Sequence, residues 1–144
     1  MKARYNKPEA VLTLEELATA AAHRRHPNNP AVIRRVYRDD RANDLTKCVI
    51  DYLRLNGCQA ERINSTGRYI TDGMHRGRWI YGSGQKGTAD ISATIRGRSV
   101  KIEIKIKDKE SEDQKKYQQA VEAAGGVYLL VRSFTEFKQW FDQL

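Results

Sequence analysis

The chain has 144 residues, 40% of them hydrophobic, and a formal net charge of +8. This size and apolar content suit one domain with its own core and argue against intrinsic disorder. No membrane span or secretory signal is expected, and the spacing of Cys48 and Cys58 does not indicate a disulfide framework. The basic surplus suits a polyanion, either nucleic acid or an anionic membrane, although many small basic domains bind neither.

Residues 1–42 are predicted to form an N-terminal extension rather than a separate domain. An Ala-rich helical pattern spans residues 12–26, with Thr13 as its candidate N-cap and Glu16 three residues later. The stretch PNNP ends this helix. Residues 31–41 are dense in arginine, and we expect either a short helix or an ordered arm.

Residues 43–57 have the clearest amphipathic pattern of the sequence. Their apolar side chains recur at helical spacing: Leu45, Cys48, Val49, Tyr52 and Leu53. The pattern predicts a helix that ends at Gly57, and it places Cys48 in the core rather than at a reactive site. Residues 58–67 are then predicted to form a strand and a turn.

Residues 67–88 are rich in glycine and arginine, with Tyr69, Trp79 and Tyr81 between them. We expect a loop or a β-hairpin with one short strand at residues 78–81. Basic side chains interleaved with aromatic rings are typical of surfaces that contact phosphates and stack on bases. A loop that serves only solubility is the alternative.

Residues 87–109, GTADISATIRGRSVKIEIKIKDK, predict a β-hairpin in which apolar and polar side chains alternate. Both apolar faces must enter the same core, which determines the residues that share the polar face. A two-residue loop at 97–98 predicts that Asp90 lies opposite Lys105 and that Ser92 lies opposite Glu103.

The polar face of this hairpin carries two acids and a lysine that folding does not require: Asp90, Glu103 and Lys105. A solvated sheet face is the alternative, but aspartate is depleted in strands, and neighbouring carboxylates repel each other unless a cation lies between them. Oxygen ligands favour Mg²⁺ or Mn²⁺. A lysine beside such an ion can orient a water molecule or stabilise charge on a phosphoryl group.

The C-terminal third predicts a helix, a strand and a second helix. Residues 111–126 form the first helix, with Ser111 as N-cap. The wholly apolar residues 127–131 are expected to form a central strand, and Ser133 caps a terminal helix. The predicted fold class is therefore α/β, with a mixed central sheet flanked by helices.

The tetrapeptide GTAD at residues 87–90, followed by EIK at 103–105, resembles the core of the PD-(D/E)xK phosphodiesterases, with Ala89 where that family often has proline. Further segments resemble the VRR-NUC branch of these nucleases in the same order: LRLNGCQAERINSTGR, KGTADISATIRGRSVKIEIK, SEDQKKYQQAVEAAGGVYLLVRS and FTEF. That branch includes stand-alone domains of phages and mobile elements. The resemblance implies a restriction-endonuclease-like nuclease domain at residues 43–144.

The resemblance also implies a metal site. Asp90, Glu103 and the Ile104 carbonyl would hold Mg²⁺ or Mn²⁺, and Lys105 would orient the attacking water. Asp44 stands where the family has an acid on the first helix, so it would contact the metal directly or through water. The alternative for Asp44 is an acid favoured only by the helix dipole.

Further positions match the surroundings of the family's site. Gln114, in the helix predicted at residues 111–126, matches a glutamine of the family, with an exposed helix residue as the alternative. DNA contacts are implied for residues of the turns and of the basic loop, which could otherwise be solvated polar positions: Asn64, Ser65, Arg68, Arg76, Arg78, Lys86 and Gly87. His75 is expected to contact DNA or solvent rather than act as a base.

The function implied is a metal-dependent DNA endonuclease directed to branched or junction DNA, acting as a homodimer, with a helicase or a replication or repair protein as a further partner. The expected location is the bacterial cytoplasm, or the host cytoplasm for a phage protein. Two alternatives stay open: a DNA-binding module that does not cut, and a subunit that needs a partner for activity. The N-terminal extension would add DNA contacts through Arg34, Arg35 and Arg38, or mediate dimerisation.

Overall fold

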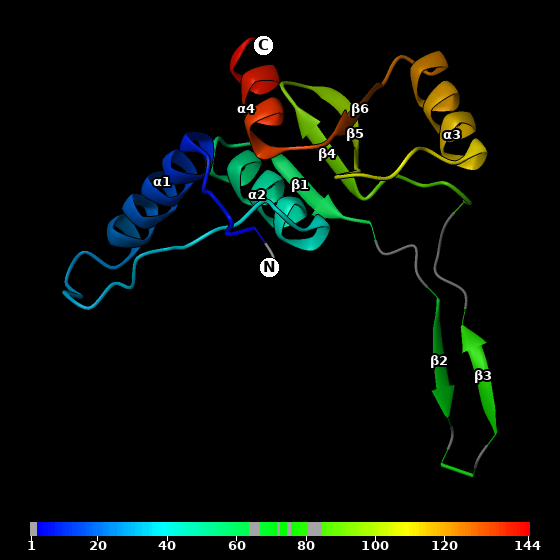
Figure 1. Cartoon of the computed structure of the whole chain (residues 1–144), viewed down its shortest axis with the longest axis horizontal. Coiled ribbons are helices and arrows are strands. Elements are labelled where there is room, and N and C mark those ends of the chain that lie inside the picture. Colours follow the sequence, from blue (N-terminus) through cyan, green and yellow to red (C-terminus); the bar gives the residue numbers. More distant parts are fainter. Residues whose placement is uncertain (1–2, 64–66, 72, 75, 81–84) are drawn as a thin grey trace.

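The structure is a computed structural model that describes residues 3–63, 67–71, 73–74, 76–80 and 85–144. Over these residues the chain forms helices and strands in the order α1 (Glu9–Arg25), α2 (Ala42–Leu55), β1 (Gln59–Arg62), β2 (Arg68–Thr71), β3 (Gly77–Ile80), β4 (Ile91–Ile95), β5 (Arg98–Ile104), α3 (Glu112–Ala123), β6 (Val127–Val131) and α4 (Phe134–Asp142). A mixed sheet flanked by helices confirms the predicted α/β class (Figure 1).

The main sheet has the strand order β1-β4-β5-β6, antiparallel except for the parallel pair β5 and β6. The prediction that residues 127–131 form a central strand is wrong, because β6 lies at an edge of the described sheet. An apolar strand indicates burial on both faces, not two neighbouring strands. Here α3 covers the second face, with the ring of Tyr117 against that of Tyr128 at 6.3 Å between centroids.

The hairpin of β4 and β5 turns through Arg96 and Gly97, one residue earlier than the predicted loop at 97–98. Both turn residues have positive φ, 50° and 79°, as the central residues of a type I′ turn require. The predicted loop is wrong because this turn type leaves Arg98 free to pair with Ile95 as the first residue of β5.

The earlier turn shifts the pairing register by two residues but leaves every side chain on its predicted face. Ser92 lies opposite Lys101 rather than Glu103, and Lys101 Nζ donates to Ser92 Oγ at 2.6 Å. Continued to the residue before β4, the register brings Asp90 level with Glu103 rather than with Lys105.

The core lies between one face of the main sheet and α1, α2 and α4. Aromatic rings of α4 surround Tyr52 of α2, with the Tyr52 and Phe134 centroids 5.4 Å apart. Cys48 is completely buried in this core, as predicted, and burial raises the pKa of its thiol to about 12. None of the helices in the described segments is both long and apolar enough to cross a membrane.

The N-terminal region joins the same core. Helix α1 begins at Glu9 after Pro8, so the predicted N-cap at Thr13 is wrong; the fixed φ of proline suits a helix start. Val11 and Leu14 of α1 are completely buried in the common hydrophobic cluster. Residues 31–41 form no helix and follow the body as an extended segment, hereafter the arm.

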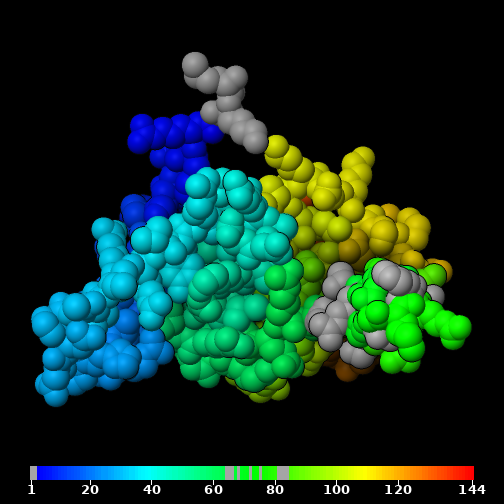
Figure 2. Space-filling view, turned by 90° about the horizontal axis from the view of Figure 1, so that it is seen from below, coloured from blue at the N-terminus to red at the C-terminus, as the bar shows by residue number. Residues whose placement is uncertain are grey.

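Strands β2 and β3 form a separate two-stranded ribbon that projects from the body (Figure 1). Tyr69 and Trp79 pair across it and are 61% and 53% exposed. Each ring lies over a glycine on the other side of the ribbon, Tyr69 over Gly77 and Trp79 over Gly67, so a Cβ at either glycine would displace the ring. Figure 2 shows this ribbon and the arm at opposite ends of the molecule, with α2 between them.

Candidate functional site

The candidate site centres on the carboxyl group of Glu103, which strand alternation directs to the sheet face opposite the core. Glu103 is only 3% exposed. Its Oε1 accepts a hydrogen bond from Gln114 Nε2 at 2.6 Å and lies 3.6 Å from Lys105 Nζ. Its Oε2 is buried and has no hydrogen-bond partner among the residues that the structure describes.

The surroundings of Glu103 hold its carboxyl group partly protonated near neutral pH. Burial and then the charge of Asp90 raise its pKa from 4.5 to about 7, against the lowering effect of the Lys105 charge and hydrogen bond. Glu110 adds a smaller upward effect. A buried acid with an unpaired oxygen beside a second acid is an arrangement in which a cation would stabilise both carboxylates.

Backbone hydrogen bonds position Asp90 beside Glu103. The Asp90 side chain accepts from the Ile104 backbone N–H at 2.8 Å through Oδ2, and its carbonyl accepts from Ile63 N–H at 2.8 Å. These bonds tie the residue to β5 on one side and to the chain after β1 on the other. The second carboxylate oxygen, Oδ1, accepts no hydrogen bond from the described residues.

Lys105 follows β5 directly, and its backbone is held on both sides. Its N–H donates to the Val131 carbonyl at 3.0 Å, and its carbonyl accepts from Arg132 Nη1 at 3.2 Å. The same Arg132 nitrogen donates to the Asp108 carbonyl at 3.1 Å. The backbone that carries the ammonium group is therefore fixed next to Glu103.

Gln114 connects the start of α3 to the acidic pair. Its Oε1 accepts from Ser111 N–H at 2.9 Å, its own N–H donates to Ser111 Oγ at 3.2 Å, and its Nε2 donates to Glu103. The capping box that begins the helix thus also holds the Glu103 carboxyl. This places Gln114 in the cluster rather than on an exposed helix face.

Gly87 lets the turn before Asp90 pack against α3. Its φ is +78°, and an added Cβ would lie 2.3 Å from the Asp113 carbonyl carbon and 2.6 Å from Gln114 N. Packing against α3 therefore explains this glycine, and its contact with DNA stays a prediction.

Asp44 is not joined to the carboxylate pair by any interaction within the described part of the chain. It lies in the first turn of α2, and its charge acts on Arg38 and Cys48. The neighbouring Asn43 accepts from Arg62 Nη2 at 2.8 Å. A metal-binding role for Asp44 remains a prediction to which this arrangement adds no support.

Two residues near Glu103 were not expected from the sequence: Glu110 and Tyr128. Burial, then the charges of Glu103 and Glu110, raise the pKa of the Tyr128 hydroxyl. Tyr128 could have been found from the strand register, because Tyr128 pairs with Lys101 and therefore shares the polar face of β5 with Glu103. Glu110 lies between elements, where periodicity gives no signal.

The residues predicted to bind DNA are spread more widely. Lys86, Arg76 and Arg78 are exposed, the last two beside and within the projecting ribbon. Other predicted contacts lie outside the described residues or have side chains that do: Asn64, Ser65, Arg68 and His75. Their roles stay predictions.

No set of three or more histidine, cysteine, aspartate or glutamate side chains is arranged around a metal position in the described segments. The cluster offers two carboxylates, with the Ile104 carbonyl as the predicted third ligand. No protein-family model matches the sequence, and neither does any curated protein. The resemblance to the VRR-NUC nucleases therefore rests on the quoted motifs alone.

Proposed function

We propose that this protein is a metal-dependent nuclease with a PD-(D/E)xK core of the VRR-NUC kind, which hydrolyses phosphodiester bonds in DNA. The observation that carries the proposal is the buried Glu103 carboxyl, whose Oε2 has no partner among the described residues and which lies beside Asp90. Such a group is costly to maintain unless a ligand satisfies it. A structural role alone gives no reason for placing two acids together there.

The residues present fit a divalent cation. Glu103 Oε2 is a buried oxygen that lacks a donor within the described segments, and Asp90 supplies a second carboxylate. Oxygen donors of this kind suit Mg²⁺ or Mn²⁺. When bound, the ion would neutralise the two acids and stabilise the negative charge that develops on the phosphodiester.

The chain's own residues would position the reactants. Lys105, a charged donor next to Glu103, would hold the attacking water and stabilise negative charge on the phosphate. Gln114 would orient Glu103 through the hydrogen bond to Oε1, leaving Oε2 for the ion. The Ile104 N–H would likewise fix Asp90 through one oxygen and leave the other for ligation.

DNA is the proposed substrate, with branched or junction DNA favoured. The net charge of +8 and the exposed pair Tyr69 and Trp79 on the basic ribbon support a nucleic-acid partner. A homodimer, which would bring two sites to two strands, a helicase or repair partner and the cytoplasmic location are parts of the same proposal, and they rest on the resemblance.

A cleavage assay tests the proposal. Purified protein with Mg²⁺ or Mn²⁺ is incubated with labelled duplex, nicked, flap and four-way-junction DNA, beside the variants Asp90→Asn and Lys105→Ala. Lys101→Ala is the matched control, because Lys101 shares the polar face of β5 but donates to Ser92. We expect the first two variants to lose at least about 100-fold in rate and the control to keep its activity.

The second candidate is a DNA-binding module that does not cut. It is favoured by the position of Asp44, which no interaction in the described residues joins to the carboxylate pair. Equal DNA binding by wild type and Asp90→Asn, without cleavage in either metal, would establish this candidate. Cleavage only after addition of a partner protein would indicate the subunit alternative.

A further inference from the structure

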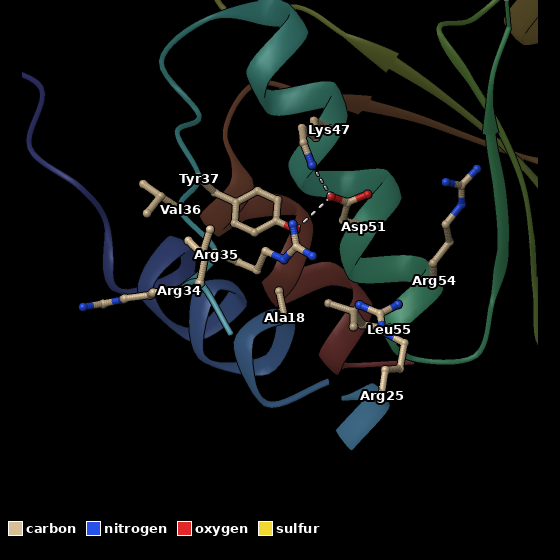
Figure 3. A pocket seen from close by; sticks show the side chains of 11 residues that line it. Ala18, Arg25, Arg34, Arg35, Val36, Tyr37, Lys47, Asp51, Arg54 and Leu55 are labelled. Atoms are coloured by element: carbon tan, nitrogen blue, oxygen red, sulfur yellow. Dashed lines mark hydrogen bonds and ion pairs between the residues drawn. The ribbon is translucent and has the colours of Figure 1, made fainter. Parts of the chain in front are cut away.

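A hollow of about 550 Å³ lies between α1, the arm and α2, away from the carboxylate cluster (Figure 3). Five basic side chains and one acid line it: Arg25, Arg34, Arg35, Lys47, Arg54 and Asp51. The residues come from three segments that are distant in sequence and meet only in the folded chain. Its lining shares no residue with the cluster around Glu103.

The floor of the hollow is held in place by one hydrogen-bonded unit. Tyr37 Oη donates to Asp51 Oδ2 at 2.8 Å, and Lys47 Nζ donates to the same oxygen at 2.6 Å. The Lys47 ammonium also lies 4.8 Å from the centroid of the Tyr37 ring. Both bonds go to Oδ2 of Asp51, the one acid of the lining, and the charge of Lys47 already balances that carboxylate.

The guanidinium groups of Arg25 and Arg35 make no hydrogen bond or ion pair with any residue that the structure describes. Figure 3 shows Arg35 directed towards Tyr37 and Asp51, whereas Arg34 points away from the hollow. Arg34 Nη2 lies 3.5 Å from Glu15 Oε2. Arg25 and Arg35 therefore gather at one concave place without a protein partner for their charge.

We propose that this hollow is a second phosphate-binding site, which takes the phosphodiester backbone of a nucleic acid outside the proposed catalytic cluster. Guanidinium groups bind phosphate oxygens through paired hydrogen bonds. The phosphate part of the inference follows from the hollow itself. The choice of nucleic acid as the source of the phosphate rests on the proposed function.

The hollow and the cluster lie on different faces of the main sheet. Ile102 faces the core under α2, and strand alternation directs its neighbour Glu103 to the opposite face. A nucleic acid that reaches both places must pass around the sheet, as a bent or branched molecule can. The site would therefore contribute affinity and shape preference, not the chemical step.

The test measures DNA binding without metal, so it does not depend on cleavage. Fluorescence anisotropy of a labelled duplex and a labelled four-way junction is followed in EDTA at salt concentrations from about 50 to 200 mM. The variant is Arg25→Gln with Arg35→Gln. The matched control is Arg24→Gln with Arg98→Gln, which removes the same charge from exposed positions outside the hollow.

We expect the hollow variant to bind at least about tenfold more weakly and to lower the slope of log affinity against log salt by about 2, one per lost phosphate contact. The control should change the slope by less than about half of that. Equal changes in both variants would overturn the proposal, because they would indicate diffuse attraction. No change in either would overturn it as well.

Two further measurements distinguish other sources of phosphate. Binding of ADP that the hollow variant loses, with unchanged DNA affinity, would overturn the nucleic-acid assignment in favour of a small ligand. Sedimentation with phosphatidylserine vesicles that depends on Arg25 and Arg35, again with unchanged DNA affinity, would overturn it in favour of a membrane surface. Melting curves of both variants check the fold, and protection of residues 31–41 from hydrogen exchange by DNA in the wild type gives a readout without mutation.

Discussion

Two buried glutamates of this protein have opposite surroundings. Glu15 of α1 is 1% exposed and Glu103 of β5 is 3% exposed. Glu15 accepts hydrogen bonds from Lys7 and from Tyr37 N–H, and Arg34 lies 3.5 Å from its other oxygen. Glu103 accepts from Gln114, but its Oε2 has no donor within the described residues.

The pKa values of the two acids follow these partners. Burial raises the pKa of Glu15, but hydrogen bonds from Lys7 and Tyr37 and the charge of Arg34 outweigh it and lower the value overall. Burial and Asp90 raise the pKa of Glu103 to about 7. The comparison separates an acid that ties the arm to α1 from an acid with one oxygen that no described residue satisfies.

The largest effect should appear when the two acids are exchanged for glutamine. Glu103→Gln should lose at least about 100-fold in metal-dependent cleavage, because the amide binds a cation poorly. Glu15→Gln should retain the cleavage rate per folded molecule while losing about 3 kcal/mol of unfolding free energy, because Lys7 and Arg34 lose their buried countercharge. Urea unfolding and single-turnover assays measure the two quantities; a Glu103→Gln variant that cleaves at the wild-type rate would refute the distinction.

The pH dependence of stability should also separate the two acids. The folded-state pKa of Glu103 is raised, so its contribution to the free energy of unfolding is fully present below about pH 4.5. That contribution is lost as the pH rises through about 7. Without metal, the free energy of unfolding of Glu103→Gln at pH 8 should therefore exceed that of the wild type by up to about 3 kcal/mol. The difference should vanish near pH 4. Urea unfolding in EDTA measures it.

Magnesium sharpens this pH prediction. At pH 8, Mg²⁺ should raise the melting temperature of the wild type, because it binds the ionised pair of the folded state. It should not raise that of Glu103→Gln. An equal rise in both proteins would mean that the ion binds elsewhere.

Gly87 tests how tightly the site is packed against α3. Gly87→Ala should cost about 2 kcal/mol or more, because it adds a positive-φ alanine and a contact of 2.3 Å with the Asp113 backbone. Gly57→Ala is the matched control, since Gly57 has a φ of +77° but nothing within 4 Å of an added Cβ. It should cost only about 1 kcal/mol. Equal losses in chemical denaturation would contradict the packing argument.

The smallest effect concerns the support of Glu103 by α3. Gln114→Ala should cost about 1 kcal/mol through the lost capping box and lower the cleavage rate about tenfold, because Glu103 loses its orienting donor. Gln118→Ala, which removes a glutamine bonded to Glu122 on the same helix, should leave the rate unchanged. Stability and rate are measured on the same preparations, and a Gln118→Ala that lost as much rate would point to a general effect on α3.

Much of the local structure could be predicted because its signals are local. The 3.6-residue period gave α2, and the Ser111 and Ser133 caps gave the starts of α3 and α4. The two-residue period of the hairpin predicted which of its side chains leave the core. The acidic pair and its lysine were predictable in the same way, since all three follow from strand alternation.

Other features depend on contacts between distant parts of the chain. The edge position of β6 follows from strand pairing across the domain. The turn at Arg96 and Gly97 set a pairing register that differs by two residues from the one predicted for a loop at 97–98. The meeting of Glu103 with Gln114, and the absence of such a contact for Asp44 in the described residues, likewise could not be derived from spacing.

The sequence by itself determined which side chains are polar, which face of each element they occupy and how much positive charge the chain carries. Those properties depend on residue type and on the short periods of helix and strand. The tertiary structure alone decided which charges meet and which find partners. Glu15 is satisfied by Lys7 and the arm, while Glu103 keeps an oxygen without a partner in the described residues, because partners separated in sequence are brought together only by the packing of the whole domain.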